Sequence, residues 1–360
     1  MRACHSVRVD LRQPSSTHTI HATAPAFQAC HPALRTASWP ARLAKRASAA
    51  AVSSQHGGDA PQRQPLRVLL TGASSGACPL CFDFYAPPLF RCRSPQRTPP
   101  GLGTAVLAAL GHESRNTAVA TCLTREPDTH TSRLTASGAA ALLAVDLAHA
   151  DSVAVLTSHL KQHQRPYDVV IHAAGGAPDT GCACSEAAMT RHLLAALAAV
   201  PSTSSALLVY VSALGVGSTA DCLPGQSVDV LLPWLSQKEA SEDAIRSSGH
   251  SHAVILRPGP LTSATSASAP ASSCILARPD DAASSKVYSP LSRQALGQLI
   301  AALAVGYHSR GGRPPEGWGA STVWAVLDPQ GVVIASPYMR RLEAWESLPF
   351  EAVHPPASVA

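Results

Sequence analysis

Apolar runs of strand length alternate with longer helical patterns between about residue 64 and residue 330. The first run, Leu66–Thr71, is short and continuously apolar and is followed by Gly72, which is typical of a strand buried on both faces. Residues 151–164 instead show the spacing of an amphipathic helix. By the same criteria we expect further strands at 117–123, 139–145, 168–172, 206–212, 253–256 and 321–327, and further helices at 103–110, 185–200, 237–248 and 292–305.

This alternation predicts the fold class. A strand followed by a helix and a second strand normally forms a right-handed parallel crossover. We therefore predict an α/β fold: a doubly wound parallel sheet with helices on both faces. Residues 77–100, with six prolines and three cysteines, show neither periodicity, and residues 262–285 are rich in Ser and Ala and predict a surface loop. The domain is expected to span 64–330, followed by a C-terminal tail at 331–360.

Composition supports one large core and excludes several function classes. Hydrophobic residues make up 46% of the chain and aromatic residues only 4%, so the core must consist mainly of Ala, Val, Leu and Ile. The net charge of +5 lies partly in the N-terminal segment, which argues against a nucleic-acid-binding face. Cys78 and Cys81 form a CxxC pair, but no second pair follows at zinc-ribbon spacing, so we expect reduced thiols and no metal. No apolar run reaches the length of a transmembrane helix.

The first 63 residues have the composition of a targeting segment. Asp10 is the only acid before Asp59, while seven Arg and Lys residues lie among Ser, Thr, Ala and His. Such acid-poor, Arg- and Ser-rich composition is shared by organelle import peptides. We expect a plastid (chloroplast) address rather than a mitochondrial one; an ordinary disordered tail is the alternative.

A glycine-rich turn follows the first strand, in the sequence Thr71-Gly72-Ala73-Ser74-Ser75-Gly76. Glycines at this place let the backbone turn sharply and approach a pyrophosphate, and the N-terminus of a following helix adds free N–H groups and a positive dipole end. The turn therefore predicts a dinucleotide-binding site, and the strand–turn–helix order makes this more specific than glycines alone.

An insertion interrupts the turn. If residues 77–101 are removed, Gly76 joins Leu102-Gly103-Thr104 and the glycine fingerprint is complete. Closing a loop of that length costs roughly 3 kcal/mol, so the fold should tolerate it. Two accounts stay open: a genuine lid-like loop in the phosphate turn, or an artefact of the gene model such as a retained intron.

Five further motifs follow in order. They are Asp146-Leu147, His172-Ala173-Ala174-Gly175, Val211-Ser212-Ala213, the helix from Lys238 to Gly249 (KEASEDAIRSSG), and Leu256-Arg257-Pro258-Gly259-Pro260-Leu261. Together with the glycine turn, they resemble the short-chain dehydrogenase/reductase superfamily. The similarity is closer to its atypical branch, the NAD(P)H-binding proteins similar to NmrA and to biliverdin and flavin reductases. It covers about 66–328 and implies a Rossmann-like domain.

The resemblance also implies a set of site residues. It assigns the phosphate turn to Gly72, Ser74, Ser75, Gly76 and Gly103, and the adenine side to Asp146 and Leu147. Room for the ribose is left by Ala173, Ala174 and Gly175, and the nicotinamide end is lined by Ser212, Lys238 and Pro258. Ser212 and Lys238 are the candidate catalytic residues.

Arg125 follows the second strand, where an NAD enzyme would carry an acid for the ribose 2′-hydroxyl. An arginine there can pair with a 2′-phosphate through charge-assisted hydrogen bonds. Arg125 therefore favours NADP(H), with NAD(H) possible; a solvated loop arginine is the alternative.

The proton donor of the superfamily is missing from its expected place. The family's catalytic tyrosine lies four residues before the lysine, and this position holds Trp234. An indole N–H is a donor that cannot release its proton at neutral pH. Tyr210 lies on the same face of its strand as Ser212, and we interpret it as a core residue.

Two functions remain open. The first is an NADP(H)-dependent oxidoreductase of the atypical type, acting on a small molecule that the sequence does not identify. Ser212 and Lys238 favour it, because hydride transfer to a good electrophile needs mainly orientation. The second is a non-catalytic NADP(H)-binding protein that senses redox state or assists assembly in an organelle, which Trp234 favours. Either protein could be a monomer or a homo-oligomer.

Overall fold

The computed structural model describes the central part of the chain. The described residues are 64–73, 101–113, 118–163, 165–175, 186–223, 225–262, 274–284, 286–315, 318–328, 333–334 and 340–341. The chain divides into two units, Met1–Gln62 and Arg63–Ala360, and every described residue belongs to the second. The predicted targeting segment, the insertion apart from Gly101, and all but four residues of the predicted tail lie outside the described residues.

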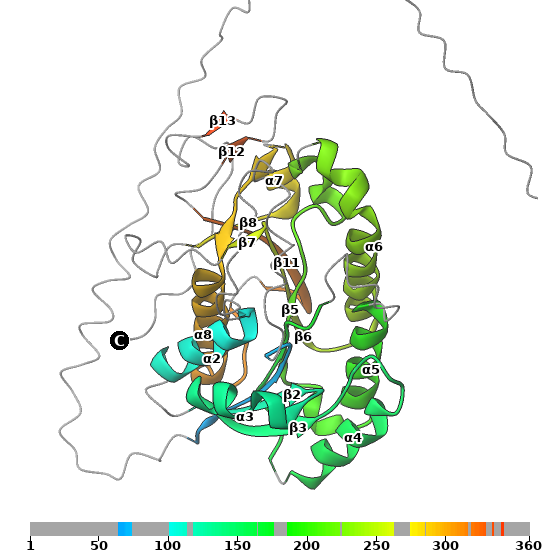
Figure 1. The fold of residues 1–360 in the computed structure, drawn as a ribbon, viewed down its shortest axis with the longest axis vertical. Coiled ribbons are helices and arrows are strands. Elements are labelled where there is room, and N and C mark those ends of the chain that lie inside the picture. Colours follow the sequence, from blue (N-terminus) through cyan, green and yellow to red (C-terminus); the bar gives the residue numbers. More distant parts are fainter. Residues whose placement is uncertain are drawn as a thin grey trace, which may run out of the picture. The chain divides into compact units, whose positions relative to one another are not determined.

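A central sheet of eight strands confirms the predicted fold class (Figure 1). Its order is β3-β2-β1-β4-β5-β6-β11-β8, and all neighbours are parallel except β11 and β8. The strands are β1 Leu66–Thr71, β2 Ala118–Thr124, β3 Ala139–Ala144, β4 Val169–His172, β5 Leu207–Val211, β6 His252–Pro258, β8 Ile275–Ala277 and β11 Ser321–Leu327.

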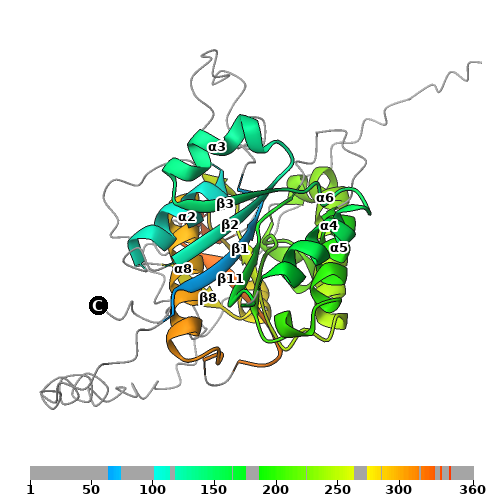
Figure 2. The same cartoon turned by 90° about the horizontal axis from the view of Figure 1, so that it is seen from below.

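Helices cover both faces of the sheet, as Figures 1 and 2 show. Helices α2 (Leu102–Glu113) and α8 (Arg293–Ser309) cover one face, and α4 (Ser152–Gln162), α5 (Glu186–Ala198) and α6 (Gly225–Ser247) the other. Successive residues of β1 point to opposite faces. Val68 and Leu70 accordingly join the core under α2 and α8, while Leu69 joins the core under α4 and α5. Among the described helices, none has both the length and the apolar composition of a membrane span.

Short elements complete the fold. Strand β7 (Leu261–Thr262) pairs with β10 (Leu291–Ser292). Strand β12 (Val333–Ile334) pairs with both β9 (Val287–Tyr288) and β13 (Arg340–Arg341). The remaining elements are α3 Pro127–Ala136, α7 Pro279–Ser284 and the 3-10 helices η3 Pro201–Thr203 and η4 Gly217–Cys222.

The structure corrects the sequence analysis at three places. Residues 262–285 are not a continuous surface loop, because Ile275–Ala277 enters the central sheet as a buried strand and α7 follows it. Helix α6 begins well before the expected residue 237 and continues through Pro233. Helix α3 was not expected, because Leu134 is the one residue that it buries, so it carries little apolar periodicity.

The strand order reverses between β1 and β4, which lie side by side in the sheet. Thr71 at the end of β1 is aligned with His172 at the end of β4. In open α/β sheets, ligands bind outside the carboxyl ends of the strands at such a switch point. The topology therefore directs attention to Thr71–Gly72 and to the residues after His172.

Candidate functional site

The backbone is packed tightly where β1 ends. Gly72 has a φ of +80°, and a Cβ built on it would lie 2.4 Å from the carbonyl oxygen of Ala173. Gly103, in the first turn of α2, approaches Ala73 so closely that a Cβ there would lie 2.5 Å from the Cα of Ala73. The Thr104 hydroxyl also donates to the Ala73 carbonyl at 3.3 Å. Neither glycine leaves room for a side chain.

The two described sides of the predicted insertion therefore meet. Ala73 and Gly103 lie in contact, as expected if β1 and α2 form one strand–turn–helix unit with an insertion in its turn. The structure brings Gly72 and Gly103 together with Ala173 and Ala174 at the switch point. The other predicted turn residues, Ser74, Ser75 and Gly76, lie outside the described residues.

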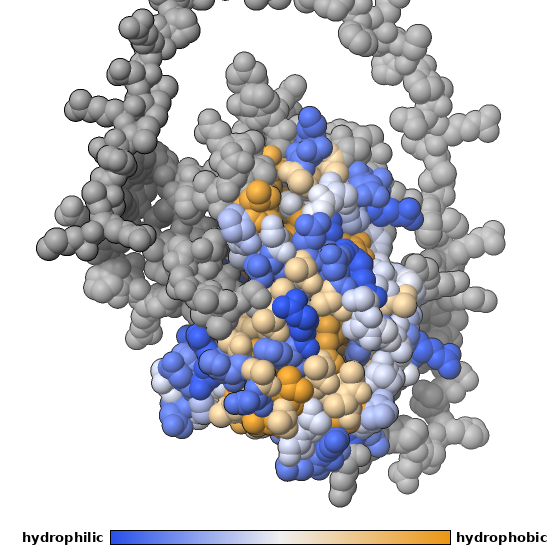
Figure 3. Space-filling view, turned by 90° about the vertical axis from the view of Figure 1, so that its right-hand side faces the viewer, coloured by the Kyte–Doolittle hydropathy of each residue, from blue (hydrophilic) through white to orange (hydrophobic). Residues whose placement is uncertain are grey.

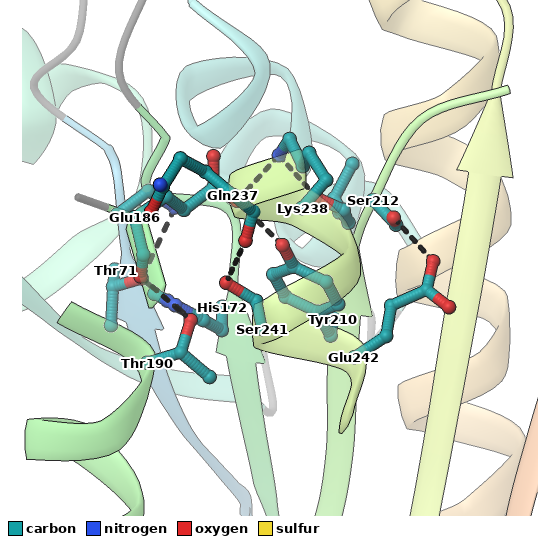
Figure 4. A network of polar contacts seen from close by, with 12 residues as sticks. Thr71, His172, Glu186, Thr190, Tyr210, Ser212, Gln237, Lys238, Ser241 and Glu242 are labelled. Atoms are coloured by element: carbon teal, nitrogen blue, oxygen red, sulfur yellow. Dashed lines mark hydrogen bonds and ion pairs between the residues drawn. The ribbon is translucent and has the colours of Figure 1, made fainter. Parts of the chain in front are cut away.

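His172 connects three elements beneath this turn (Figure 4). Its Nδ1 lies 2.7 Å from the Thr71 hydroxyl, and its Nε2 lies 3.0 Å from the Thr190 hydroxyl on α5. The ring is fully buried. Burial, followed by the nearby charge of Lys238, lowers the pKa of His172 to about 3. The imidazole is therefore uncharged at neutral pH and holds β1 and β4 to α5.

A second set of contacts joins Glu186, the first residue of α5, to Lys238 on α6 and Tyr210 on β5 (Figure 4). The Lys238 ammonium donates to Glu186 Oε1 at 2.6 Å and to the Val211 carbonyl at 2.9 Å. The Tyr210 hydroxyl donates to the same Oε1 at 2.6 Å. Burial and the Glu186 carboxylate raise the pKa of Tyr210 well above its usual value. Tyr210 is thus a buried hydrogen-bond donor to Glu186.

Trp234 lies one helical turn before Lys238 on α6. Its ring centroid is 5.5 Å from the Lys238 ammonium, and the Tyr210 ring centroid is 5.4 Å from it. Both rings lie at the distance of a cation–π contact. The indole Nε1 is buried and has no hydrogen-bond partner among the described residues. The ring that replaces the superfamily's tyrosine therefore contacts the lysine through its π-face.

Ser212 is held by a different carboxylate. Its hydroxyl donates to Glu242 Oε1 on α6 at 2.6 Å. Glu242 also accepts from Arg257 on β6, Nε to Oε1 at 2.9 Å and Nη2 to Oε2 at 2.7 Å, and from Arg246. The Glu242 side chain is completely buried. The two predicted catalytic side chains thus bond to separate acids, Lys238 to Glu186 and Ser212 to Glu242.

Sequence reasoning missed these two acids and Arg257 as site-forming residues. Glu242 and Arg257 lie inside the quoted helix and strand-end motifs, so a weak signal was present. Glu186 is a single acid at the start of an apolar helix and gave no signal of burial.

The remaining predicted residues lie at the ends of other strands. Arg125 directly follows β2 and is exposed. Asp146 follows β3, and its Oδ1 accepts from the backbone N–H of Ala148 at 3.0 Å. Leu147 is buried. The backbone carbonyl of Pro258, at the end of β6, accepts a hydrogen bond from the Leu214 N–H at 2.7 Å.

A groove on the surface of the molecule lies apart from the predicted site residues, and the described residues include no candidate metal site. The face of α5 and α6 bears a shallow groove, and Figure 3 shows apolar surface among hydrophilic surface on this side of the molecule. It is lined by Arg191, Leu194, Ala195, Ala198, Ala240, Asp243, Ala244, Ser247 and Ser248. Among the described residues, no group of three or more His, Cys, Asp or Glu side chains could hold a metal ion. Cys78 and Cys81 lie outside the described residues.

One family model and several solved structures are similar to this chain. Residues 101–305, more than half of the chain, match a family model described as NAD(P)H-binding, and the match begins where the predicted insertion ends. No curated protein matches the chain. Among solved structures, a protein described as an NAD-dependent epimerase/dehydratase from Bacillus halodurans is similar at 17% identity and a TM-score of 0.46, covering 73% of this chain and 94% of its own.

Two further solved structures are similar. The anaerobillin reductase ChuY from Escherichia coli has 16% identity and a TM-score of 0.45, with 73% of this chain and 97% of its own covered. A short-chain dehydrogenase/reductase from Serratia marcescens has 13% identity and a TM-score of 0.44, with 73% and 97% covered.

Proposed function

We propose that this chain, which belongs to the NAD(P)H-binding family, is an NADP(H)-dependent oxidoreductase of the atypical short-chain dehydrogenase/reductase type. The observation that carries the proposal is the close packing of Gly72 against Ala173 and of Gly103 against Ala73 at the switch point of the sheet. These contacts bring the end of β1 and the N-terminus of α2 together in one tight turn, where a pyrophosphate could approach the backbone N–H groups and the N-terminus of α2.

The residues present fit a dinucleotide. Gly72 and Gly103, with the predicted Ser74, Ser75 and Gly76, would hold the pyrophosphate. Asp146 and Leu147 would lie on the adenine side, and Ala173, Ala174 and Gly175 would leave room for the ribose. Ser212, Lys238 and Pro258 would line the nicotinamide end.

Arg125 supports NADP(H) over NAD(H). It follows β2, the strand that pairs with β1 directly beside the glycine turn. The exposed guanidinium can pair with a 2′-phosphate by charge-assisted hydrogen bonds without a large desolvation cost.

The reacting end supports hydride transfer without a proton from the protein. A bound nicotinamide supplies or accepts a hydride. Tyr210 is fully buried against Glu186, His172 is uncharged, and Trp234 offers an N–H that does not ionise. Lys238 can orient an acceptor and stabilise negative charge on it. A delocalised electrophile such as a flavin or a quinone is therefore the favoured substrate class over a simple ketone.

The same observations favour a second candidate, a non-catalytic NADP(H)-binding protein that senses redox state or assists assembly. Trp234 is the observation that supports this second candidate, because a cofactor-binding domain without a proton donor could bind NADP(H) and transfer no hydride.

The experiment is a cofactor titration followed by turnover. Binding of NADPH at 100 times its dissociation constant should stabilise the fold by about 2.7 kcal/mol, measured as a thermal shift. NADPH oxidation with flavins, quinones and carbonyl compounds then separates the enzyme from the sensor. Absence of any shift with NADPH, NADP, NADH and NAD would reject both candidates.

Residues 1–63 are proposed to direct the protein to an organelle, with a plastid favoured over a mitochondrion. Their acid-poor, Arg- and Ser-rich composition supports this. A fusion of these residues to a fluorescent protein should accumulate in plastids; diffuse fluorescence in the cytosol would contradict it.

A further inference from the structure

The two carboxylate oxygens of Glu186 differ in their hydrogen bonding. Oε1 accepts from both Lys238 and Tyr210 at 2.6 Å. Oε2 is buried and has no hydrogen-bond partner among the described residues, although the side chain is only 2% exposed. A buried carboxylate oxygen without a donor is costly, and such atoms are uncommon in folded proteins.

The unpaired oxygen faces Gly175. A Cβ built on Gly175 would lie 2.8 Å from Glu186 Oε2 and 3.2 Å from Lys238 Nζ. Gly175 follows β4 at the switch point and is itself exposed. Because residue 175 is a glycine, no side chain of this residue stands between the buried pair and the exposed backbone that follows β4.

Lys238 also has donor capacity to spare. An ammonium has three N–H groups. The described contacts of Nζ use two of them, to Glu186 and to the Val211 carbonyl. Among the described contacts, the pair beside Gly175 therefore leaves one charged acceptor and one charged donor unpaired next to each other.

We infer that Glu186 is a ligand-binding residue whose free Oε2 accepts a hydrogen bond from a sugar hydroxyl of the bound dinucleotide, the ribose next to the nicotinamide. A hydroxyl both donates and accepts, so two neighbouring hydroxyls match an adjacent acceptor and donor. One hydroxyl donates to Glu186 and the other accepts from Lys238. This inference rests on the proposed function and adds Glu186 to its binding site.

Two substitutions test the role of the pair. Glu186→Gln keeps the size of the side chain but replaces a charged acceptor by an amide. Gly175→Ala keeps both side chains but places a methyl group against Glu186 Oε2, so the carboxylate must shift and the space in front of the pair is filled. Gly175 has no positive φ, so alanine fits its backbone. Gly111→Ala on α2 is the matched control, since a Cβ there meets nothing within 4 Å.

The ligands are NADPH and adenosine diphosphate carrying a 2′-phosphate, which lacks the second ribose. Dissociation constants are measured by calorimetry. A charge-assisted hydrogen bond predicts a loss of about ten-fold or more in NADPH affinity for Glu186→Gln and Gly175→Ala. Affinity for the truncated ligand should stay within about two-fold, and Gly111→Ala should bind both ligands like the unsubstituted protein.

The outcomes separate the two proposals. If the unsubstituted protein binds none of the nicotinamide dinucleotides, the proposed function fails and this inference fails with it. If it binds NADPH and both variants bind it equally well, the inference is overturned and the proposed function stands. Equal losses for NADPH and for the truncated ligand would also overturn it, because the damage would then not concern the second ribose.

Discussion

Arg257 and Glu242 form a two-point ion pair inside the molecule, with Nε to Oε1 at 2.9 Å and Nη2 to Oε2 at 2.7 Å. The two side chains are 5% and 0% exposed. They come from the two motifs, on α6 and at the end of β6, that carried much of the family resemblance. Glu242 also accepts the hydrogen bond of Ser212, so this pair sets the direction of the predicted catalytic hydroxyl.

Substitution Glu242→Gln should strongly destabilise the fold. It leaves Arg257 buried without its counter-charge, which costs about 3–5 kcal/mol. Urea unfolding measures the loss. The control is Asp243→Asn, whose side chain is 69% exposed in its ion pair with Arg246, and which should change stability by less than about 1 kcal/mol. Similar, small losses in both variants would contradict the structural role of the pair.

His172 should make the protein less stable in mild acid. Its pKa is about 3 in the folded protein and near 6.5 when unfolded, so the unfolded state binds the proton more tightly. The contribution is complete above pH 6.5 and is lost as the pH falls toward 3. Between pH 7 and pH 5 it amounts to about 2 kcal/mol.

The variant His172→Asn tests this contribution. Asparagine can still form hydrogen bonds, but it does not titrate. The variant should therefore lose less stability than the unsubstituted protein between pH 7 and pH 5, measured by urea unfolding at each pH. Because other histidines titrate in both proteins, the difference isolates His172. Identical pH dependences would show that His172 is not the titrating group.

Gly72→Ala should damage the turn at the end of β1. A Cβ would lie 2.4 Å from the Ala173 carbonyl oxygen at a φ of +80°, so the backbone must move. We expect a destabilisation of about 2 kcal/mol or more and no detectable NADPH binding. Gly111→Ala again serves as the control, and it should stabilise α2 by about 0.5–1 kcal/mol. A Gly72→Ala protein with full stability and binding would rule out the close contact.

Arg125→Ala should remove the preference for NADPH. Loss of a charge-assisted contact with the 2′-phosphate weakens NADPH binding by about ten-fold or more and leaves NADH binding unchanged. Affinities for the two cofactors, measured by fluorescence titration, give the ratio. Arg133→Ala on α3 is a control at a second arginine after β2. An unchanged ratio in Arg125→Ala would refute the role given to this arginine.

Trp234→Tyr should introduce carbonyl reduction. A phenol one turn before Lys238 can release a proton that the indole cannot. NADPH oxidation with small aldehydes and ketones should rise above that of the unsubstituted protein. Trp234→Phe, which has the ring of tyrosine without its hydroxyl, should show no gain. Because Glu186 already pairs with Lys238, the gain at saturating NADPH should grow when Trp234→Tyr is combined with Glu186→Gln, which by itself weakens NADPH binding. No gain in either protein would show that proton donation is not the missing step.

The sequence by itself determined the fold class, most of the strands and helices of the central sheet layers, and the cofactor family. These follow from local information: the burial of β1 shows as a continuous apolar run, Gly72 and Gly103 mark a turn without room for side chains, and the position of Trp234 follows from its spacing to Lys238. A pattern of this kind needs no knowledge of distant contacts.

Tertiary structure alone decided the partners of the site residues. Lys238 meets Glu186 from another helix, and Ser212 meets Glu242 and Arg257 across α6 and β6. The entry of β8 into the sheet likewise depends on its pairing with β11. Buried charges are stable only beside their counter-charges, and strands at a sheet edge only beside their neighbours. Since these neighbours lie far apart in the chain, the glycine turn could be predicted, whereas the two carboxylates that hold Lys238 and Ser212 could not.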